Sequence, residues 1–284
     1  MILLDGKKLA AEAYQKFMKL NFQEKSIYKL IIITINEDAA SAVYVKQKIN
    51  ACKLIGIAYE HIMLKNTMTE SEFEDYLNKL LYENIYSIKS PYYKVGFILQ
   101  LPAPQKYQNI FNIVIPPSSD VDGFGMLNKE ALYITNKTPW NYPATPKGII
   151  TLLKHYKIPI TGKHVVIIGR SDIVGKPLAQ MMLNENATVT VCHSKTENLK
   201  QITKTADILV VAMGNPNFIT SEYIKEGVTI IDVGINRTSN GICGDVNFES
   251  VKDKCYAITP VPGGVGPMTV YSLIENLITY EKLD

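Results

Sequence analysis

KHVVIIGRSDIVGKPLAQMML, residues 163–183, decides the fold class of this chain. The apolar run up to Ile168 predicts a buried strand, a tight turn begins at Gly169, and a helix opens near Gly175. A turn of this kind directs backbone N–H groups and a helix N-terminus toward a phosphate. We therefore predict a strand–turn–helix unit of the type found in nucleotide-binding α/β domains, with Gly169 and Gly175 next to the phosphate.

The glycine pattern of this turn is incomplete. Ser171 stands where the second glycine of the G-x-G-x-x-G dinucleotide fingerprint would be, and the spacing to Gly175 is longer. A P-loop fits worse, because Pro177 replaces the hydroxyl residue that would bind magnesium. The turn therefore indicates a dinucleotide only together with signals elsewhere in the chain, and Arg170 and Ser171 are further candidate ligands of such a cofactor.

Helices and strands alternate on both sides of this unit. Such alternation predicts parallel sheets that are covered by helices. The predicted fold class is therefore α/β with two domains, an N-terminal one with a mainly parallel sheet and a Rossmann-like, doubly wound one. The predicted strands span 29–35, 59–64, 94–100, 163–169, 187–192, 206–214 and 228–234, and the predicted helices span 7–20, 40–55, 69–81, 175–185 and 268–281.

The boundary between the two domains is predicted at TNKTPWNYPATPKG, residues 135–148, which carries three prolines and little periodicity. Residues 139–264 would form the dinucleotide-binding domain. Residues 1–138 would form the other domain together with 265–284, because the final helix can return to it and pack there.

Composition narrows the class of protein. A length of 284 residues with 46% hydrophobic residues is enough for two packed domains, and a net charge of +3 without a basic run argues against nucleic-acid binding. No apolar run approaches the roughly 20 residues of a membrane helix, and the N-terminal MILLDGKK does not resemble a signal peptide. We therefore expect a cytoplasmic protein without a membrane partner. The four cysteines form no C-x-x-C pair, so no metal site is expected.

Arginine is rare in this chain, since only Arg170 and Arg237 are arginines among 30 basic residues. Both follow predicted strands in glycine-containing loops, where a planar guanidinium suits a phosphate. The strand after the Gly169 turn ends in CHSKT, residues 192–196, without the carboxylate that binds the ribose 2′-hydroxyl in NAD enzymes. Ser194 and its neighbours instead favour the 2′-phosphate of NADP. A plain solvated turn is the alternative.

Polar residues of the N-terminal half indicate a site for chemistry. Tyr44 and Lys48 are four residues apart on a predicted helix, so they share a face and can act on one ligand. Gln100 ends a predicted buried strand, and ligands of open parallel sheets bind outside the carboxyl ends of strands. The segment SSDVDGFG puts Asp120 and Asp122 in a glycine-containing loop. The alternatives are a solvent-facing strand end for Gln100 and a turn or capping role for the two aspartates.

A set of segments in a fixed order carries a family resemblance. They are YVKQKINACKLIGI, ILQLPAP, DVDGF, TPKGI, IGRSDIVGKP, CHSKT, DVGIN, GDV and ITPVPGGVGPMT. In this order they resemble bifunctional methylenetetrahydrofolate dehydrogenase/cyclohydrolase, the FolD family. The resemblance runs from Asp5 to the last helix, and PVPGGVGPMT, QLP and DVDGF are its most specific parts.

The resemblance implies NADP-dependent oxidation of 5,10-methylenetetrahydrofolate and hydrolysis of the methenyl product to 10-formyltetrahydrofolate, in a homodimer. Asp122 would bind the N–H edge of the pterin, and Tyr44 would line the ring. Gln100 would hold the amine of Lys48, the base or proton shuttle of hydrolysis. The implied catalytic residues Tyr44, Lys48, Gln100 and Asp122 would also bind substrate, together with Leu99, Leu101, Pro262, Gly263, Gly264, Val265 and Gly266. The implied cofactor-binding residues are Gly169, Arg170, Ser171, Gly175, Ser194 and Ile235.

Some positions near the predicted site depart from the family pattern. Ala103 replaces a usual leucine, Val95 an acidic residue and Ser119 a lysine. These changes leave every proposed catalytic group in place, so they bear on fine specificity.

A short-chain dehydrogenase also has a Tyr-x-x-x-Lys pair, but there the pair follows the nucleotide-binding segment. A monofunctional dehydrogenase of the same family and a catalytically silent nucleotide-binding protein are the remaining alternatives.

Overall fold

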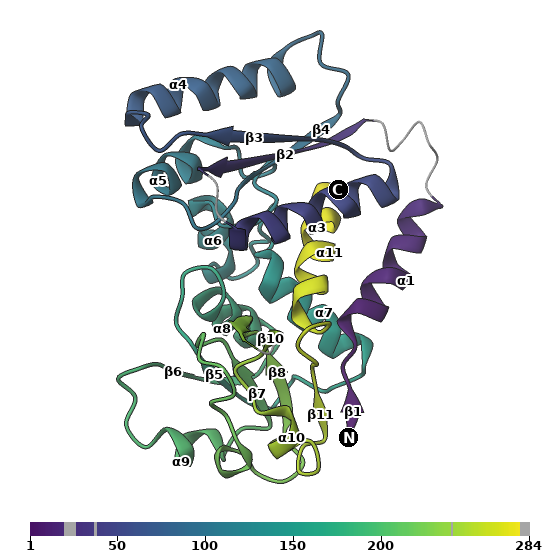
Figure 1. Cartoon of the computed structure of the whole chain (residues 1–284), viewed down its shortest axis with the longest axis vertical. Coiled ribbons are helices and arrows are strands. Elements are labelled where there is room, and N and C mark those ends of the chain that lie inside the picture. The colour runs from purple at the N-terminus through teal and green to yellow at the C-terminus, as the bar shows by residue number, and fades with distance from the viewer. Residues whose placement is uncertain (20–26, 37–38, 240, 279–284) are drawn as a thin grey trace. The chain divides into compact units, whose positions relative to one another are not determined.

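The structure, a computed structural model, describes residues 1–19, 27–36, 39–239 and 241–278 (Figure 1). Backbone contacts divide the chain into two compact units. The six-stranded unit comprises Met1–Ala11 and Thr145–Thr269, and the three-stranded unit comprises Glu12–Ala144 and the chain from Val270 onward. Within the described ranges, no helix combines the length and the apolar character needed to span a membrane.

A parallel sheet in the order β3–β2–β4 forms the centre of the three-stranded unit, as far as the structure describes it. β2 (Tyr28–Ile35) pairs with both β3 (Ala58–Leu64) and β4 (Lys94–Leu99). The predicted parallel sheet is confirmed. The other elements are the second part of α1 (Gly6–Met18), α3 (Ala39–Ile55), α4 (Glu70–Leu81), η1 (Tyr82–Tyr86), α5 (Gln105–Val114), α6 (Met126–Tyr133) and the second part of α11 (Val265–Ile278). The predicted helix ends at 20 and 279–281 lie outside the described residues.

Different helices cover the two faces of this sheet. On one face, Phe97 of β4 packs with Phe73 of α4 and Tyr107 of α5. On the other face, Gly96 of β4 leaves room for Leu277 of α11, whose side chain would lie 3.0 Å from an added Cβ. The last helix therefore packs on the N-terminal sheet, as the sequence predicts. Cover on both faces explains why β2 and β4 are almost entirely apolar and buried.

The sheet of the six-stranded unit runs in the order β1–β11–β8–β7–β5–β6 in the described residues, and all its neighbouring strands are parallel. β5 lies between β6 and β7, so the chain first extends the sheet to one side and then returns to the other. This reversal is the topological switch point at which doubly wound sheets bind ligands. The Rossmann-like prediction is confirmed. The elements are β1 (Ile2–Leu3), α7 (Ala144–His155), β5 (His164–Ile168), α8 (Gly175–Asn184), β6 (Thr188–Cys192), α9 (Leu199–Thr203), β7 (Ile208–Val211), η2 (Ser221–Tyr223), β8 (Thr229–Asp232), β9 (Asn236–Thr238), β10 (Gly241–Cys243), α10 (Phe248–Val251), β11 (Ala257–Ile258) and the first part of α11.

β1 and the antiparallel hairpin of β9 and β10 are not predicted from the sequence. β1 pairs with β11 at the edge of the sheet, through Ile2 with Ala257 and Leu3 with Ile258. Contacts therefore group Met1–Ala11 with the six-stranded unit. The division into functional domains at residues 138 and 265 stays a prediction.

Helix α7 begins inside the predicted linker, at Ala144. Pro146 lies in its first turn, where the missing N–H costs no helical hydrogen bond. Gly148 packs closely against the first part of α11, because an added Cβ would lie 2.9 Å from the backbone carbonyl carbon of Met268. The TPKG part of the linker is thus an ordered helix start within its unit.

Candidate active site

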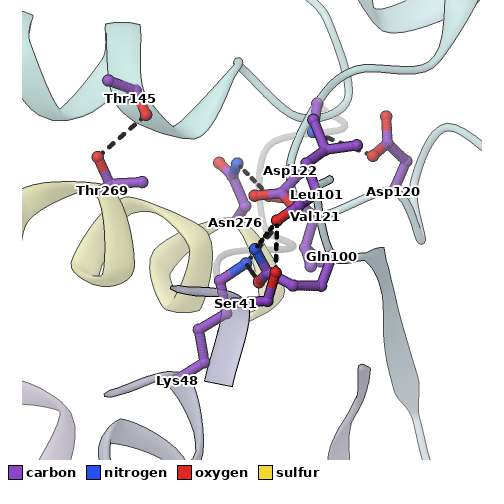
Figure 2. Close-up of polar contacts among 11 residues, drawn as sticks. Ser41, Lys48, Gln100, Leu101, Asp120, Val121, Asp122, Thr145, Thr269 and Asn276 are labelled. Carbon is purple, nitrogen blue, oxygen red and sulfur yellow. Dashed lines mark hydrogen bonds and ion pairs between the residues drawn. The ribbon is translucent and has the colours of Figure 1, made fainter. Parts of the chain in front are cut away.

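Lys48, Gln100 and Asp122, far apart in the sequence, meet in the three-stranded unit and form what we call the Lys48 cluster (Figure 2). The Lys48 amine donates to Gln100 Oε1 at 3.0 Å and lies 3.7 Å from Asp122 Oδ2. The side chain of Lys48 is 7% exposed and that of Asp122 13%. An ammonium that is nearly removed from water needs an opposite charge and hydrogen bonds. The amide and the carboxylate of this cluster supply them.

The orientation of Gln100 follows from bonds around it. Its backbone N–H, just after β4, donates to Ile33 O of β2 at 2.8 Å. Its Nε2 donates to Leu101 O at 2.9 Å, which turns Oε1 toward Lys48. Ser41 Oγ at the start of α3 donates to the same Leu101 carbonyl at 3.1 Å. Gln100 is buried, so the alternative of a solvent-facing strand end is excluded.

Tyr44 lies on α3, one helical turn before Lys48, and is half-buried. The shared helix face predicted from their spacing follows directly from this helix. Leu99 ends β4 and is buried in the apolar cluster with α4 and α5, whereas Leu101 is half-buried. The roles of these residues toward a ligand stay predictions.

Asp120 organises the loop that carries Asp122. Its Oδ1 accepts from Gly123 N at 3.1 Å, and its Oδ2 accepts from Gly125 N at 2.7 Å and from Asn128 Nδ2 at 3.1 Å. Burial raises the pKa of the Asp120 carboxyl, against the lowering effect of the Gly125 N–H and the Asn128 amide. Asp120 therefore has the turn role considered for both aspartates, whereas Asp122 faces the amine.

Asn141 and Asn276 hold the backbone of the same loop. Asn141 Nδ2 donates to Asp120 O at 2.9 Å, and Asn276 Nδ2 donates to Val121 O at 2.9 Å. Figure 2 shows Asn276 reaching the loop beside Asp122. Because Asn276 belongs to α11, the C-terminal helix helps to fix the residue that precedes the Asp122 carboxylate.

The Lys48 cluster keeps chemical capacity for a ligand. The distance of 3.7 Å between Lys48 Nζ and Asp122 Oδ2 is longer than a hydrogen bond, so the amine does not donate a hydrogen bond to this oxygen. An amine can donate hydrogen bonds or take up a proton, and a carboxylate can accept two N–H groups. Among the residues that the structure describes, no group of His, Cys, Asp or Glu side chains is arranged to hold a metal ion.

In the six-stranded unit, the Gly169 turn has a geometry that requires glycine. Gly169 has φ +135°, and an added Cβ would clash with Ala212 O. A Cβ on Gly175 would clash with Gly169 O, so α8 starts directly against the turn. Ser171 Oγ accepts from Val174 N at 3.2 Å, ahead of this helix. These contacts explain why both positions are glycine and how the backbone can approach a ligand closely.

Exposed polar groups follow β5 and the neighbouring strand β6. After β6, His193 N donates to Thr196 Oγ1 at 2.8 Å, and Thr196 N donates to His193 O at 2.9 Å. This turn leaves Ser194 and Lys195 exposed, and Arg170 is exposed in the turn after β5. A guanidinium and a hydroxyl at the ends of neighbouring strands suit an anionic group of a ligand.

The segment at residues 262–266, predicted to bind substrate, belongs to the six-stranded unit. Gly263 has φ +114°, and its carbonyl accepts from Lys7 N at 2.8 Å. Ile235 is exposed, and its Cδ1 lies 3.7 Å from the position of a Cβ on Gly266. The Lys48 cluster belongs to the other unit, so a joint contact of the two sets with one ligand stays a prediction.

Two family models match the chain. The catalytic-domain model of tetrahydrofolate dehydrogenase/cyclohydrolase matches residues 4–122, and the NAD(P)-binding-domain model of the same family matches residues 143–284. The chain belongs to the tetrahydrofolate dehydrogenase/cyclohydrolase family. The Lys48 cluster falls within the match to the catalytic domain of this family, and the Gly169 turn falls within the match to its NAD(P)-binding domain.

Similar proteins of the tetrahydrofolate dehydrogenase/cyclohydrolase family extend over nearly the whole chain. The bifunctional protein FolD of Halalkalibacterium halodurans is 44% identical over 285 residues, which cover 99% of each chain. The crystal structure of the bifunctional FolD enzyme from Campylobacter jejuni is 41% identical, with a TM-score of 0.88 over 98% of this chain and 97% of that one. A Trypanosoma brucei FolD structure, complexed with NADP cofactor and an inhibitor, is 30% identical, with a TM-score of 0.87 over 98% and 96%. The predicted family is confirmed.

Several buried polar residues of this family member are not predicted from the sequence. Ser41, Asn141 and Asn276 hold the segments around the Lys48 cluster. Asp232 and Asp245 are buried in the six-stranded unit. The sequence gives a signal only for Asp232 and Asp245, which lie in the family segments DVGIN and GDV, because residue type alone does not show burial.

Asp232 ends β8 and binds the backbone around it. Its Oδ1 accepts from Gly234 N at 3.0 Å, and its Oδ2 accepts from Val246 N at 2.9 Å. Burial raises the pKa of Asp232 to about 6; the N–H groups of Val246 and Asp245 act against this rise, and the Asp245 carboxylate adds to it.

Proposed function

We propose that this chain oxidises 5,10-methylenetetrahydrofolate to 5,10-methenyltetrahydrofolate with NADP, and hydrolyses the product to 10-formyltetrahydrofolate. The Lys48 cluster carries the proposal. It gathers an amine, an amide and a carboxylate at the carboxyl end of β4, within the match to the catalytic domain of the family. In the first reaction, bound NADP supplies the hydride acceptor.

The oxidation needs residues that hold the folate. Loss of a hydride from the carbon between N5 and N10 leaves a methenyl cation, and no proton moves in this step. The Asp122 carboxylate would accept two N–H groups from the aminopyrimidine edge of the pterin. Tyr44, half-buried on α3, would line the ring. Orientation of this kind accounts for a large part of the rate enhancement in a two-reactant step.

The hydrolysis needs a group that moves protons. Water adds to the methenyl carbon and loses a proton. The resulting carbinol then opens: its hydroxyl proton leaves, a carbonyl forms, and the C–N5 bond breaks as N5 gains a proton. Lys48, as a neutral amine, would take the first proton and return one to N5. Gln100 aligns this amine through the 3.0 Å hydrogen bond. Once the amine is protonated, the Asp122 carboxylate balances the positive charge of Lys48.

The six-stranded unit fits NADP. The Gly169 turn brings backbone and the start of α8 together at the switch point, where an added side chain would fill the space. Arg170 and Ser194 are exposed beside it, and residues 193–196 after β6 include no carboxylate that would favour a 2′-hydroxyl. The residues proposed to hold NADP are Gly169, Arg170, Ser171, Gly175, Ser194 and Ile235.

An assay of the full chain tests the proposed function. With 5,10-methylenetetrahydrofolate and NADP, we expect the absorbance of NADPH to rise and 10-formyltetrahydrofolate to accumulate. A reaction without enzyme gives the spontaneous rate of methenyl hydrolysis. Formation of NADPH with hydrolysis only at this spontaneous rate would indicate a monofunctional dehydrogenase. No NADPH and no accelerated hydrolysis would refute the proposal.

Arg170→Ala tests the preference for NADP. Removal of a charge-assisted hydrogen bond to the 2′-phosphate is expected to raise the KM for NADP about tenfold or more, while the KM for NAD changes little. Steady-state kinetics with both cofactors measure the two values. Lys204→Ala removes an exposed cation of the same unit, just after α9, and is the matched control that should leave the NADP to NAD ratio unchanged. Equal losses for both cofactors in Arg170→Ala would mean that this arginine does not contact the 2′-phosphate.

We also propose that the chain acts in the cytoplasm and that it forms a homodimer, the latter as the family resemblance implies. Sedimentation equilibrium of the purified chain tests the dimer, and a mass equal to that of one chain at working concentration would exclude it.

A further inference from the structure

The Asp245 carboxylate, buried in the six-stranded unit, binds consecutive N–H groups of one loop. Its Oδ2 accepts from Met213 N at 2.8 Å and from Gly214 N at 2.9 Å. Its Oδ1 accepts from Asn215 N at 2.8 Å and from Asn236 Nδ2 at 2.8 Å. Asp245 is 0% exposed, so its charge depends on these donors in place of water. The Asp245 carboxylate therefore fixes the backbone conformation of the loop at residues 213–215.

Asp232 and a pair of glycines hold Asp245 in turn. Asp232 Oδ1 accepts from Asp245 N at 3.0 Å. A Cβ on Gly234 would clash with the Asp245 carboxylate, and a Cβ on Gly244 would clash with that of Asp232. Each carboxylate thus occupies the space that a side chain would need. This packing leaves Asp245 little freedom to move relative to the loops.

The loop that Asp245 binds lies at the switch point of the sheet. Residues 213–215 follow β7, and the Gly169 turn follows β5, its neighbour. A Cβ on Gly169 would clash with Ala212 O, so the turn and the start of this loop touch. A doubly wound sheet binds its dinucleotide between two such segments, outside the carboxyl ends of the strands.

We infer that Asp245 is a positioning residue for the dinucleotide. Its carboxylate holds the 213–215 loop next to the Gly169 turn, and it does not touch the ligand itself. The same carboxylate also accepts a hydrogen bond from Asn236 Nδ2, next to Ile235 in the chain. One buried group therefore fixes the positions of two loops of the proposed cofactor site. This inference rests on the proposed function, since it takes NADP as the ligand. Hydrolysis of the methenyl compound uses no nucleotide and should not depend on Asp245.

Asp245→Asn in the full-length chain tests the inference through two separate measurements. Asparagine keeps the size but has one acceptor oxygen, and its NH₂ would face N–H donors. Titration calorimetry is expected to show a Kd for NADP about tenfold or more above wild type, while hydrolysis of 5,10-methenyltetrahydrofolate without NADP keeps the wild-type rate. Asp253→Asn changes an exposed carboxylate of the same unit and is the matched control, with both values unchanged.

The outcomes separate positioning from general support of the fold. A wild-type Kd in Asp245→Asn would overturn the inference, and so would a parallel loss of NADP binding and hydrolysis. If Asp245→Asn does not fold, Gly234→Ala, which drives a methyl group against the carboxylate, should give the same result: a raised Kd for NADP and an unchanged hydrolysis rate. Failure of both variants to fold would also overturn the inference. A wild-type chain that binds NADP but does not convert folate would refute the proposed function, while the Kd comparison would still decide the role of Asp245.

Discussion

Lys48→Met is expected to lower the rate of methenyltetrahydrofolate hydrolysis by about 100-fold or more, since a positioned general acid or base contributes roughly 10²–10⁴-fold. Methionine keeps an unbranched stem in the buried position but has no amine, so the hydrogen bond to Gln100 and the charge beside Asp122 are both lost. Oxidation moves no proton, and NADP reduction should therefore fall by a smaller factor. The decay of methenyl absorbance and the rise of NADPH absorbance measure the two effects.

Lys46→Met is the matched control for this prediction, because Lys46 lies on the same helix and is exposed. Both of its activities should equal those of wild type. Undiminished hydrolysis in Lys48→Met would remove Lys48 from the mechanism. Equal losses of hydrolysis and oxidation would leave it only a role in folate binding.

Asp122→Asn is expected to raise the KM for folate in both reactions by about 100-fold, the order expected when hydrogen bonds to a charged group are lost. In the proposed binding mode the carboxylate accepts two pterin N–H groups, whereas an amide offers one oxygen and turns its NH₂ toward the second donor. The Kd for NADP should stay at the wild-type value, since Asp122 belongs to the three-stranded unit and its proposed partner is the pterin. Initial rates over a range of folate concentrations measure the change.

Glu130→Gln makes the same type of change at an exposed carboxylate of the same unit and should alter neither KM. If Asp122→Asn instead lowers kcat with an unchanged KM for folate, the carboxylate acts on the Lys48 amine and does not bind the pterin. A lower melting temperature in Asp122→Asn alone would assign it the structural role that Asp120 has in the same loop.

The fold follows from the sequence where local signals are strong. Buried parallel strands such as β2 and β4 are almost entirely apolar, and Thr69 with Glu72 forms the capping box that starts α4. Helix α5 is not predicted from the sequence, although Tyr107 and Phe111 have helical spacing and pack in the same apolar cluster. β1 is only a pair of residues, and its partner is at the other end of the chain, so no local pattern indicates it.

Most of the candidate site is predicted by the family resemblance and not by residue spacing. The spacing of Tyr44 and Lys48 predicts their shared helix face, but no spacing shows that Gln100 and Asp122 lie beside this amine, because strand pairing and the Asp120 turn bring them there. Asp245 is not predicted as part of the site. Its importance comes from burial and from N–H donors of distant loops, which a single sequence does not reveal.

The place of β1 at the edge of the six-stranded sheet has a consequence for experiments on separate halves of the molecule. This strand is synthesised long before its partner β11, so the sheet lacks both outer strands until residues 257–258 have been synthesised. A fragment of residues 139–264 would carry β11 with an unpaired outer edge, and such edges recruit strands from other chains. Excising the nucleotide-binding half would therefore yield a self-associating fragment unless the first residues of the chain are fused back to it.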